Sequence, residues 1–228
     1  MTYSELVTAI QTYTENTFPS TTLADSTVVS STTQINRIIQ QAEQRIYNTV
    51  QFPSLRKNVT GVMATNNKYL NCPLDFLATY SMAFVDTDGS YVYLLNKDVN
   101  FIREAYPKPT DLGSPKYYAL FGPQSGNAAE LTFIVGPTPD ASYTVELHYY
   151  YYPESITTAT TTWLGDNFDT VLLYASLVEA YTFMKGETDM MTLYNQKFVE
   201  ALALAKRLGD GLERQDAYRT PQFRQAVN

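Results

Sequence analysis

The residues that most often carry out covalent chemistry in proteins are scarce in this chain of 228 residues. It contains one histidine, His148, and one cysteine, Cys72, beside 19 tyrosines. No Gly-x-Ser-x-Gly turn accompanies His148, so a hydrolytic triad is not expected. A zinc site of the His/Cys type cannot be assembled from one residue of each kind. We therefore predict no catalytic residue, no metal site and no cofactor, and an enzyme is the least favoured functional class.

Two other segments have part of the composition of a ligand-binding loop. Residues 121–127, FGPQSGN, lack both the spacing and the lysine of a phosphate-binding loop. Residues 85–90, VDTDGS, share aspartates and a glycine with a calcium loop, but the downstream glutamate is missing and Tyr91 follows directly. A plain hairpin turn is the better interpretation of residues 85–90.

The tyrosines are the strongest compositional signal in the chain. Tyr has a large apolar ring, a polar tip and few rotatable bonds, so it can lie half-buried at a subunit boundary at small entropic cost. Tyr is also an ordinary strand residue, and the excess could equally reflect a β-rich core with wet edges. Both interpretations remain open at the level of composition.

One carboxylate lies in an unusually apolar setting. The segment Val171 to Met184 is apolar on almost every side but contains Glu179, and it is shorter than the roughly 20 residues of a membrane span. A charge in a core helix must be paired or hydrogen-bonded. We predict that Glu179 pairs across a helical bundle with Arg45, or alternatively with Arg37, as a packing contact and not as a general base.

The proposed partners Glu179, Arg45 and Arg37 lie in segments near the two ends of the chain that are predicted to be helices. Apolar residues recur at helical spacing in residues 3–15, 32–50, 166–185 and 187–208. Pro53 ends the second of these segments, and Gly186 and Gly209 are predicted stops for the last two. The Ser/Thr-rich residues 16–33 show little periodicity and are predicted to be a loop of variable conformation.

Between the helices the hydrophobic period changes to two. Short apolar runs joined by Asn, Asp and Gly turns fill residues 55–152 and predict an antiparallel sheet, with one short helix closed by Pro107. The predicted fold class is α+β, a helical bundle formed by N- and C-terminal helices with a central antiparallel β domain. We expect the bundle at 1–54 and 154–209, the β-rich domain at 55–153 and an extended tail at 210–228.

Charge and cysteine usage narrow the possible partners. The net charge of −7 argues against wrapping nucleic acid by phosphate neutralisation. The N-terminal residues MTYSELVTAI show no secretion signal, and we expect synthesis in a reducing host cytoplasm, with no membrane partner. Cys72 is predicted to be a small buried apolar residue.

Five segments in order resemble the tailed-phage head-to-tail adaptor proteins, including the tail tubular A type of short-tailed phages. The likeness runs from about residue 35 to residue 218. The segments are AEQRIYNTVQFPSLRKNVTG, YLNCPLDFL, FIREAYPKPTDLGSPKYYALFG, VELHYYYYPESI and WLGDNFDTVLLYASLVEAYTFMKGETDM. The Ser/Thr-rich residues 16–33 depart from the tighter connection that the resemblance would imply.

The resemblance implies a virion protein at the neck. Such a protein forms a homo-dodecameric ring below the portal protein, extends the DNA channel and provides a platform for a distal tail or nozzle protein. It also implies that the C-terminal tail docks on the portal. In this chain the tail supplies aromatic and basic residues that suit a segment ordering on binding. The expected docking residues are Tyr218, Arg219, Pro221, Phe223 and Arg224.

Charge is distributed as a DNA channel would require. Residues 1–54 hold four acidic and two basic residues, and residues 154–186 hold four acidic and one basic, so these helical parts carry −5 of the net −7. If these helices line the lumen, double-stranded DNA passes without tight binding.

Two alternatives remain. Another neck, tail-tube or baseplate component would share the aromatic, acidic character with a different stoichiometry. A carbohydrate-binding β module would use exposed tyrosines and Trp163 to stack on sugars, although one tryptophan is thin support for such a platform.

Overall fold

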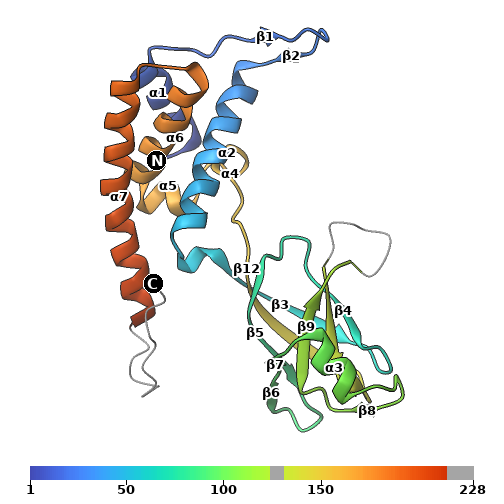
Figure 1. Ribbon diagram of the computed structural model, residues 1–228. Helices are drawn as coiled ribbons and strands as arrows, with labels where there is room; N and C mark the ends of the chain where they lie inside the picture. Colours follow the sequence, from blue (N-terminus) through green and yellow to red (C-terminus); the bar gives the residue numbers. More distant parts are fainter. Residues whose placement is uncertain (124–130, 215–228) are drawn as a thin grey trace. The chain divides into compact units, whose positions relative to one another are not determined.

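The computed structural model describes residues 1–123 and 131–214, with side chains up to residue 207, and it divides into two compact units (Figure 1). One unit combines Met1–Ser54 with the chain from Pro153 onward, and the other is Leu55–Tyr152. The first unit is mainly helical and the second is mainly strands, so the predicted α+β class is confirmed. The β unit is therefore an insertion between two stretches of helical chain.

The helical unit is organised around α6 (Asp169–Met184), which contacts the three other long helices of the unit. These are α1 (Tyr3–Thr14), α2 (Ser31–Thr49) and α7 (Thr188–Arg214). A helix that is covered on several sides needs apolar residues around most of its circumference, which explains why α6 has no clear polar face. Its buried residues are Val171, Leu172, Ala175, Ser176, Leu177, Val178 and Ala180.

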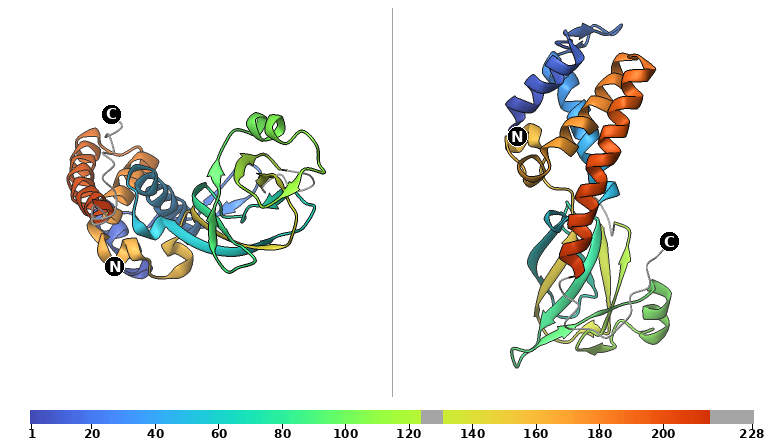
Figure 2. Two further views of the ribbon diagram at one scale, coloured as in Figure 1. Left: turned by 90° about the horizontal axis from the view of Figure 1, so that it is seen from below. Right: turned by 90° about the vertical axis from the view of Figure 1, so that its left-hand side faces the viewer.

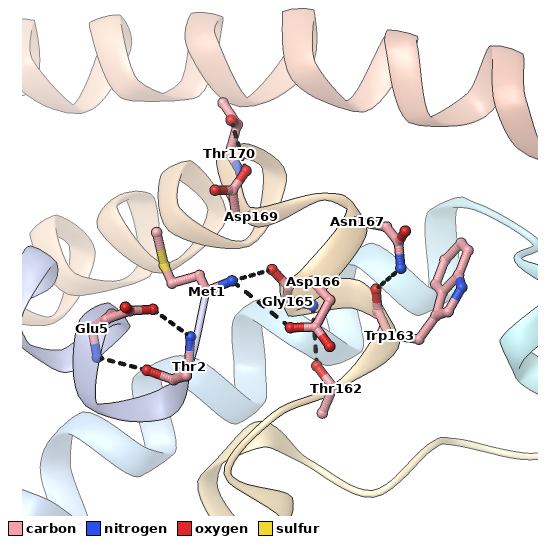
Figure 3. A network of polar contacts seen from close by, with 10 residues as sticks. All are labelled: Met1, Thr2, Glu5, Thr162, Trp163, Gly165, Asp166, Asn167, Asp169 and Thr170. Atoms are coloured by element: carbon pink, nitrogen blue, oxygen red, sulfur yellow. Dashed lines mark hydrogen bonds and ion pairs between the residues drawn. The ribbon is translucent and has the colours of Figure 1, made fainter.

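The N-terminal ends of α1 and α2 are fixed by side-chain caps. Thr2 and Glu5 form a capping box, in which the Glu5 N–H donates to Thr2 Oγ1 at 3.3 Å and the Thr2 N–H donates to Glu5 Oε2 at 2.8 Å (Figure 3). Ser30 caps α2 by accepting from the Thr33 N–H at 3.1 Å. A 3₁₀ turn at Pro53–Leu55 follows α2, as expected from the proline.

The C-terminal ends of α6 and α7 differ from the glycine stops expected from the sequence. Lys185 takes the left-handed conformation that ends α6, with φ 54°, and the next N–H, that of Gly186, donates to Tyr181 O at 2.9 Å. The last helix passes through Gly209 and ends at Arg214, so the predicted stop at Gly209 is wrong. A glycine costs only about 1 kcal/mol in a helix, so Gly209 and Gly211 weaken this part of α7 without ending it.

Residues 16–33 are predicted to be a variable loop, but residues 31–33 belong to α2 and residues 16–30 follow a defined path. They include a small antiparallel ribbon, β1 (Thr21–Thr22) with β2 (Val28–Val29). Phe18 is buried, and its ring lies 6.2 Å from that of Phe183 on α6. The Gln34 amide of α2 donates to Pro19 O at 3.0 Å and to Val29 O at 3.3 Å. One aromatic anchor and one amide therefore order a segment whose composition suggested variability.

The larger sheet of the β unit is antiparallel, in the order β3-β12-β5-β6. Its strands are β3 (Arg56–Met63), β12 (Tyr143–Tyr150), β5 (Ala78–Val85) and β6 (Tyr91–Tyr93). Burial alternates along β12, as its period of two predicts. Just beyond the paired ends of β3 and β12, the Tyr151 N–H donates to Leu55 O at 2.9 Å, so the chain enters and leaves this unit at adjacent points.

The second sheet has the order β4-β10-β9-β7, and part of it is parallel. Its strands are β4 (Tyr69–Asn71), β10 (Thr132–Gly136), β9 (Tyr117–Phe121) and β7 (Leu95–Asn96). β7 pairs with β9 in parallel, and β8 (Leu112–Gly113) pairs in parallel with β11 (Thr138–Pro139). The central antiparallel sheet predicted from the sequence is confirmed, and the two short parallel pairs add to it. The crossover that parallel pairing requires is supplied by α3 (Val99–Ala105), which packs on β9 and β10.

The core of the β unit lies between its two sheets. Phe133 of β10 meets Phe76 and Tyr118 edge to face, with ring centroids 5.3 and 5.7 Å apart. Cys72 is buried in the same cluster, which confirms its predicted role as a small apolar residue. Figure 2 shows the strands of this unit, coloured from cyan to yellow, from two further sides. The remaining buried members include Met63, Met82, Phe84, Leu94, Val135, Tyr143, Val145, Leu147 and Tyr149.

Gly165 provides a test of the helical core. It lies in α5 (Trp163–Asn167), which follows the short α4 (Ile156–Ala159), and its carbonyl accepts from the Met1 amino group at 2.8 Å (Figure 3). A Cβ at this position would lie 2.8 Å from Met1 O and 3.0 Å from Ile156 Cδ1. We expect Gly165→Ala to lower the free energy of unfolding by about 1–3 kcal/mol, because backbone must move to admit the methyl group. Chemical denaturation would measure the loss.

Gly61→Ala is the matched control for this substitution, since an added Cβ there meets nothing within 4 Å. It should leave the free energy of unfolding almost unchanged. Equal stability of the Gly165→Ala variant and the wild type would contradict the packing described at α5.

Candidate interaction surfaces

The structure brings together the two residues of the proposed bundle ion pair. Arg45 Nη1 of α2 lies 3.2 Å from Glu179 Oε1 of α6. Arg45 Nη2 also lies 3.5 Å from Asn195 Oδ1, and the guanidinium carbon lies 5.0 Å from the centre of the Phe198 ring, both on α7. Arg45 therefore links three helices of the unit. Arg37, the alternative partner, instead lines a groove of the helical unit.

The Arg45–Glu179 pair is partly accessible to water. The side chains are 41% and 22% exposed. Pairs of this kind typically contribute about 0.2–1 kcal/mol, because solvent screens the attraction and two long side chains lose freedom. The stacking of Arg45 on Phe198 and its contact with Asn195 make the geometry more specific than a lone pair. The contact is better suited to fixing how α2, α6 and α7 align than to supplying much stability.

A more deeply buried carboxylate was missed by the sequence reasoning. Glu43 of α2 is 3% exposed, and it accepts a hydrogen bond from the Ile156 N–H of α4 at 2.9 Å. Burial raises the pKa of the Glu43 carboxyl, although hydrogen bonds from Ile156 and Ser155 act in the opposite direction. Its position four residues after Ile39 and three before Ile46 places it on the apolar stripe of α2. That spacing was the signal that could have identified it.

The predicted portal-docking residues lie outside the described part of the chain. They are Tyr218, Arg219, Pro221, Phe223 and Arg224. Their role therefore stays a prediction from composition and resemblance.

The tyrosines of the β unit divide between its core and its surface. Tyr149 and Tyr143 are 1% and 5% exposed, whereas Tyr80, Tyr91 and Tyr93 are 53%, 57% and 69% exposed. Tyr91 and Tyr93 lie on β6, an edge strand of the larger sheet. The interpretation as core residues thus fits Tyr143 and Tyr149, and the interpretation as contact residues fits the exposed tyrosines. The exposed subset forms a surface suited to contacts with other molecules.

His148 has neighbours that the sequence did not reveal. Its Nδ1 lies 3.0 Å from Ser81 Oγ of β5, and its Nε2 lies 3.5 Å from Glu146 Oε1 of its own strand. A serine, a histidine and a carboxylate are thus adjacent, as in a hydrolytic triad. Catalysis by such a group also needs N–H donors directed at a developing oxyanion. β5 and β12 are both interior strands, whose main-chain groups pair with neighbouring strands, so the cluster suits binding better than turnover.

Other candidate ligand sites have structural explanations. Residues Asp86 to Ser90 form the turn between β5 and β6, in which the Asp86 N–H donates to Ser90 O at 2.9 Å and Gly89 has φ 86°. The predicted hairpin turn is confirmed there. Within residues 1–123 and 131–214, no group of three or more His, Cys, Asp or Glu residues is placed to hold a metal ion. No helix in the same residues is both long and apolar enough to span a bilayer.

The Arg45–Glu179 contact can be measured by a double-mutant cycle. We expect Arg45→Met and Glu179→Gln to show a coupling energy of about 0.2–1 kcal/mol in the free energy of unfolding, decreasing as salt is added. The exposed pair Lys197–Glu200, 3.1 Å apart on α7, is the reference and should show less coupling. Zero coupling at low salt would mean that the 3.2 Å contact does not orient these helices.

Glu43 predicts a pH dependence of stability. Because its pKa is raised by burial, the folded carboxyl keeps its proton at pH values where the unfolded chain, near its ordinary 4.5, has lost it. The folded state therefore binds more protons in that window, and stability falls as pH rises through it. Denaturation of the wild type and of Glu43→Gln from pH 4.5 to neutral pH should show the wild type losing stability relative to the variant.

The control for this pH series is Glu187→Gln, at an exposed carboxylate of the same unit. Its difference from the wild type is the baseline for removing an exposed charge, against which the Glu43→Gln series is compared. A constant difference between the wild type and Glu43→Gln over this pH range would show that the Glu43 carboxyl titrates alike in the folded and unfolded chains.

A comparison with models of known protein families found a match for this chain. The model of the family described as SU10 adaptor protein matches residues 1–225, almost the whole sequence. Among curated proteins, none matches the chain significantly. The family supports a structural role for the chain in a bacteriophage virion. The chain therefore belongs to the SU10 adaptor protein family of phage proteins.

Proposed function

We propose that copies of this chain form a closed dodecameric ring at the neck of the virion, below the portal, resembling the tail tubular A type of adaptor. The ring continues the DNA channel and provides the platform on which a distal tail or nozzle protein docks. The observation that carries the proposal is the family match over residues 1–225. The resemblance also implies a helical bundle with a β domain in each subunit, and the helical unit and the β unit of this chain agree with that layout.

Ring closure requires two different flanks on every subunit, because a head-to-tail contact repeats by rotation until it closes. Both units expose large apolar side chains that could cover such flanks. Phe183 and Leu204 of the helical unit are 54% and 64% exposed, and Tyr91 and Tyr93 of the β unit exceed half exposure. Aromatic residues of this kind are enriched at protein interfaces.

Charge supports passage of DNA through such a ring. Residues 1–54 and 154–186 together carry −5 of the net −7. Acidic walls repel the phosphate backbone and release no counterions on contact, so DNA would pass without being trapped. Helices of the bundle facing the lumen would give the channel this property.

The C-terminal tail is the proposed portal contact. Beyond Asp216 it contains Arg219 and Arg224 and no acidic side chain, together with Tyr218 and Phe223. Aromatic and arginine side chains are the ones that most often dominate binding energy at interfaces. The tail would thus provide anchors of the right kind for a partner surface.

The carbohydrate-binding alternative loses its main support. Trp163 packs against Phe52 and Phe168, with ring centroids 5.3 and 5.4 Å away, and it belongs to the helical unit. Its indole is 37% exposed, but it lies on the helical unit and not on the sheet that would form a sugar-binding platform. Another neck, tail-tube or baseplate component remains a possible role within the same structural class.

Stoichiometry tests the proposal. Native mass spectrometry and class averages of the purified protein, alone and mixed with portal rings, should show twelve-fold rings seated on the portal. A combined Tyr218→Ala, Arg219→Ala and Phe223→Ala variant should no longer sediment with portal rings, while its circular dichroism stays unchanged.

The matched control for the tail is Thr220→Ala with Gln222→Ala, which removes neither a charge nor an aromatic ring and should retain portal binding. A ring of another symmetry, or full portal binding by the triple variant, would contradict the corresponding part of the proposal.

A further inference from the structure

A small recess opens on the face of the larger sheet that points away from the core of the β unit. Three neighbouring strands line it: β12 with Glu146 and His148, β5 with Ser81 and Ala83, and β6 with Tyr91 and Tyr93. Its volume is about 110 Å³. We call it the Glu146 recess. It is large enough for the head group of one side chain and too small for a helix or a strand.

Strand register explains why the recess exists. Glu146 pairs with Ala83, and Ala83 pairs with Tyr93, so a small residue lies directly between two large ones. Ala83 is 5% exposed and forms the floor, whereas Tyr93 is 69% exposed and forms a wall. Cross-strand neighbours have Cβ atoms only about 5 Å apart, so the side chains of Glu146 and Tyr93 stand over the same methyl group. The recess is therefore a consequence of the sheet pairing and not of a loop.

The carboxylate in the recess is held in a fixed orientation. Glu146 Oε1 accepts from Asn58 Nδ2 at 2.8 Å and lies 3.5 Å from His148 Nε2. The imidazole is fixed in turn by Ser81 Oγ, 3.0 Å from Nδ1. Three neighbours on three strands thus orient one carboxyl group, which lowers the entropic cost of using it for binding.

The same carboxylate has no strong cationic partner. The Glu146 side chain is 23% exposed, and among the described residues no lysine or arginine lies within ion-pair distance of it. The other carboxylate oxygen, Oε2, makes no hydrogen bond within the same residues. Glu146 thus has a free acceptor oxygen, and two exposed tyrosine rings line the same recess. We infer that the recess suits a cationic group.

Arginine matches these features better than other groups. Its planar guanidinium donates several hydrogen bonds to a carboxylate and stacks on aromatic faces, and it is more weakly hydrated than an ammonium group. Cations over tyrosine rings gain a further contribution of about 0.5–1 kcal/mol at exposed sites. Tyrosine and arginine are also the residues enriched at interface hot spots.

We propose that the Glu146 recess receives an arginine side chain from the distal protein that docks on this ring. The inference rests on the proposed function, because it assigns one contact of the docking platform. Glu146 pairs with the guanidinium, Tyr91 and Tyr93 flank it, and Asn58, His148 and Ser81 are positioning residues that hold the carboxylate. Charge complementarity selects a basic segment of the partner, and the shape of the recess selects a single side chain.

The chain contains its own reporter for this contact. His148 is the only histidine, so its ring signals in an NMR spectrum need no assignment. At fixed pH, N-acetyl-arginine amide should shift these signals saturably, with a dissociation constant on the order of millimolar. N-acetyl-lysine amide should bind several-fold more weakly. Equal shifts with both amides, or no saturable shift with either, would overturn the inference.

Two variants of the full chain distinguish the recess from general surface charge. Glu146→Gln keeps an acceptor for Asn58 but removes the charge, and it should weaken arginine amide binding about tenfold. Tyr93→Ala should weaken it about two- to fivefold. The control is Glu104→Gln, an exposed carboxylate on α3 of the same unit, which should bind like the wild type. Unchanged binding by Glu146→Gln would refute the assignment.

The identity of the occupant is tested by photo-crosslinking in assembled particles. With p-benzoylphenylalanine in place of Tyr93, the crosslinked peptide should come from the distal tail or nozzle protein and contain an arginine. A crosslink to a second copy of this chain, or to its residues 215–228, would overturn the choice of partner.

Ring stoichiometry separates the two proposals. Glu146→Gln should form rings like the wild type. If rings form but the recess fails to bind arginine, only this inference fails. If no ring forms with the wild-type chain, the proposed function fails whatever the recess binds.

Discussion

Covering the apolar circumference of α6 is the constraint from which the architecture follows. No single neighbour can bury a helix with apolar residues on nearly every side, so α1, α2 and α7 are all required. α1 and α2 come from the start of the chain and α7 follows α6, which means that the two ends of the sequence must meet. Everything between Ser54 and Pro153 is then free to fold as a second unit with its own core.

The polar contacts of the helical unit lie between its helices, where they can fix how the helices align. Arg45 reaches from α2 to Glu179 on α6 and to Phe198 on α7, while Glu43 satisfies the first N–H of α4 at Ile156. The Met1 amino group meets Gly165 O within 2.8 Å. Apolar burial is non-directional, so contacts of this kind are what can select one alignment of helices from several of similar area.

The hydrophobic periodicity of the sequence was enough to predict most helices and strands. It failed where contacts between residues distant in sequence determine the structure. The apolar stripes of α2, α6 and α7 and the alternation of β12 indicated the α+β class correctly. The parallel pairing of β7 with β9 could not be inferred, since it depends on how α3 packs and not on any local pattern. Residues 16–30 were misjudged because Phe18 and Gln34 order them through contacts distant in sequence.

The positions of the tyrosines could not be predicted from composition. Their excess was compatible both with contact surfaces and with a β-rich core, and only strand register shows that Tyr91 and Tyr93 are outside while Tyr143 and Tyr149 are inside. His148 looked isolated in the sequence. Its neighbours Ser81 and Glu146 come from an adjacent strand and from two residues earlier, and cross-strand proximity is not visible in a linear pattern. Arg45 and Glu179 could be paired beforehand because a charge in an apolar helix demands a counterion.

The hydrogen bond between Tyr151 N and Leu55 O means that the β unit begins and ends at one point. Because both ends of the β unit meet at this junction, the β unit can become longer or shorter, or be replaced, without a change in the helical unit. Changes in the β unit therefore have a route that leaves the fold of the helical unit untouched. A lineage could exchange the whole β unit between residues 55 and 152 and keep its helices.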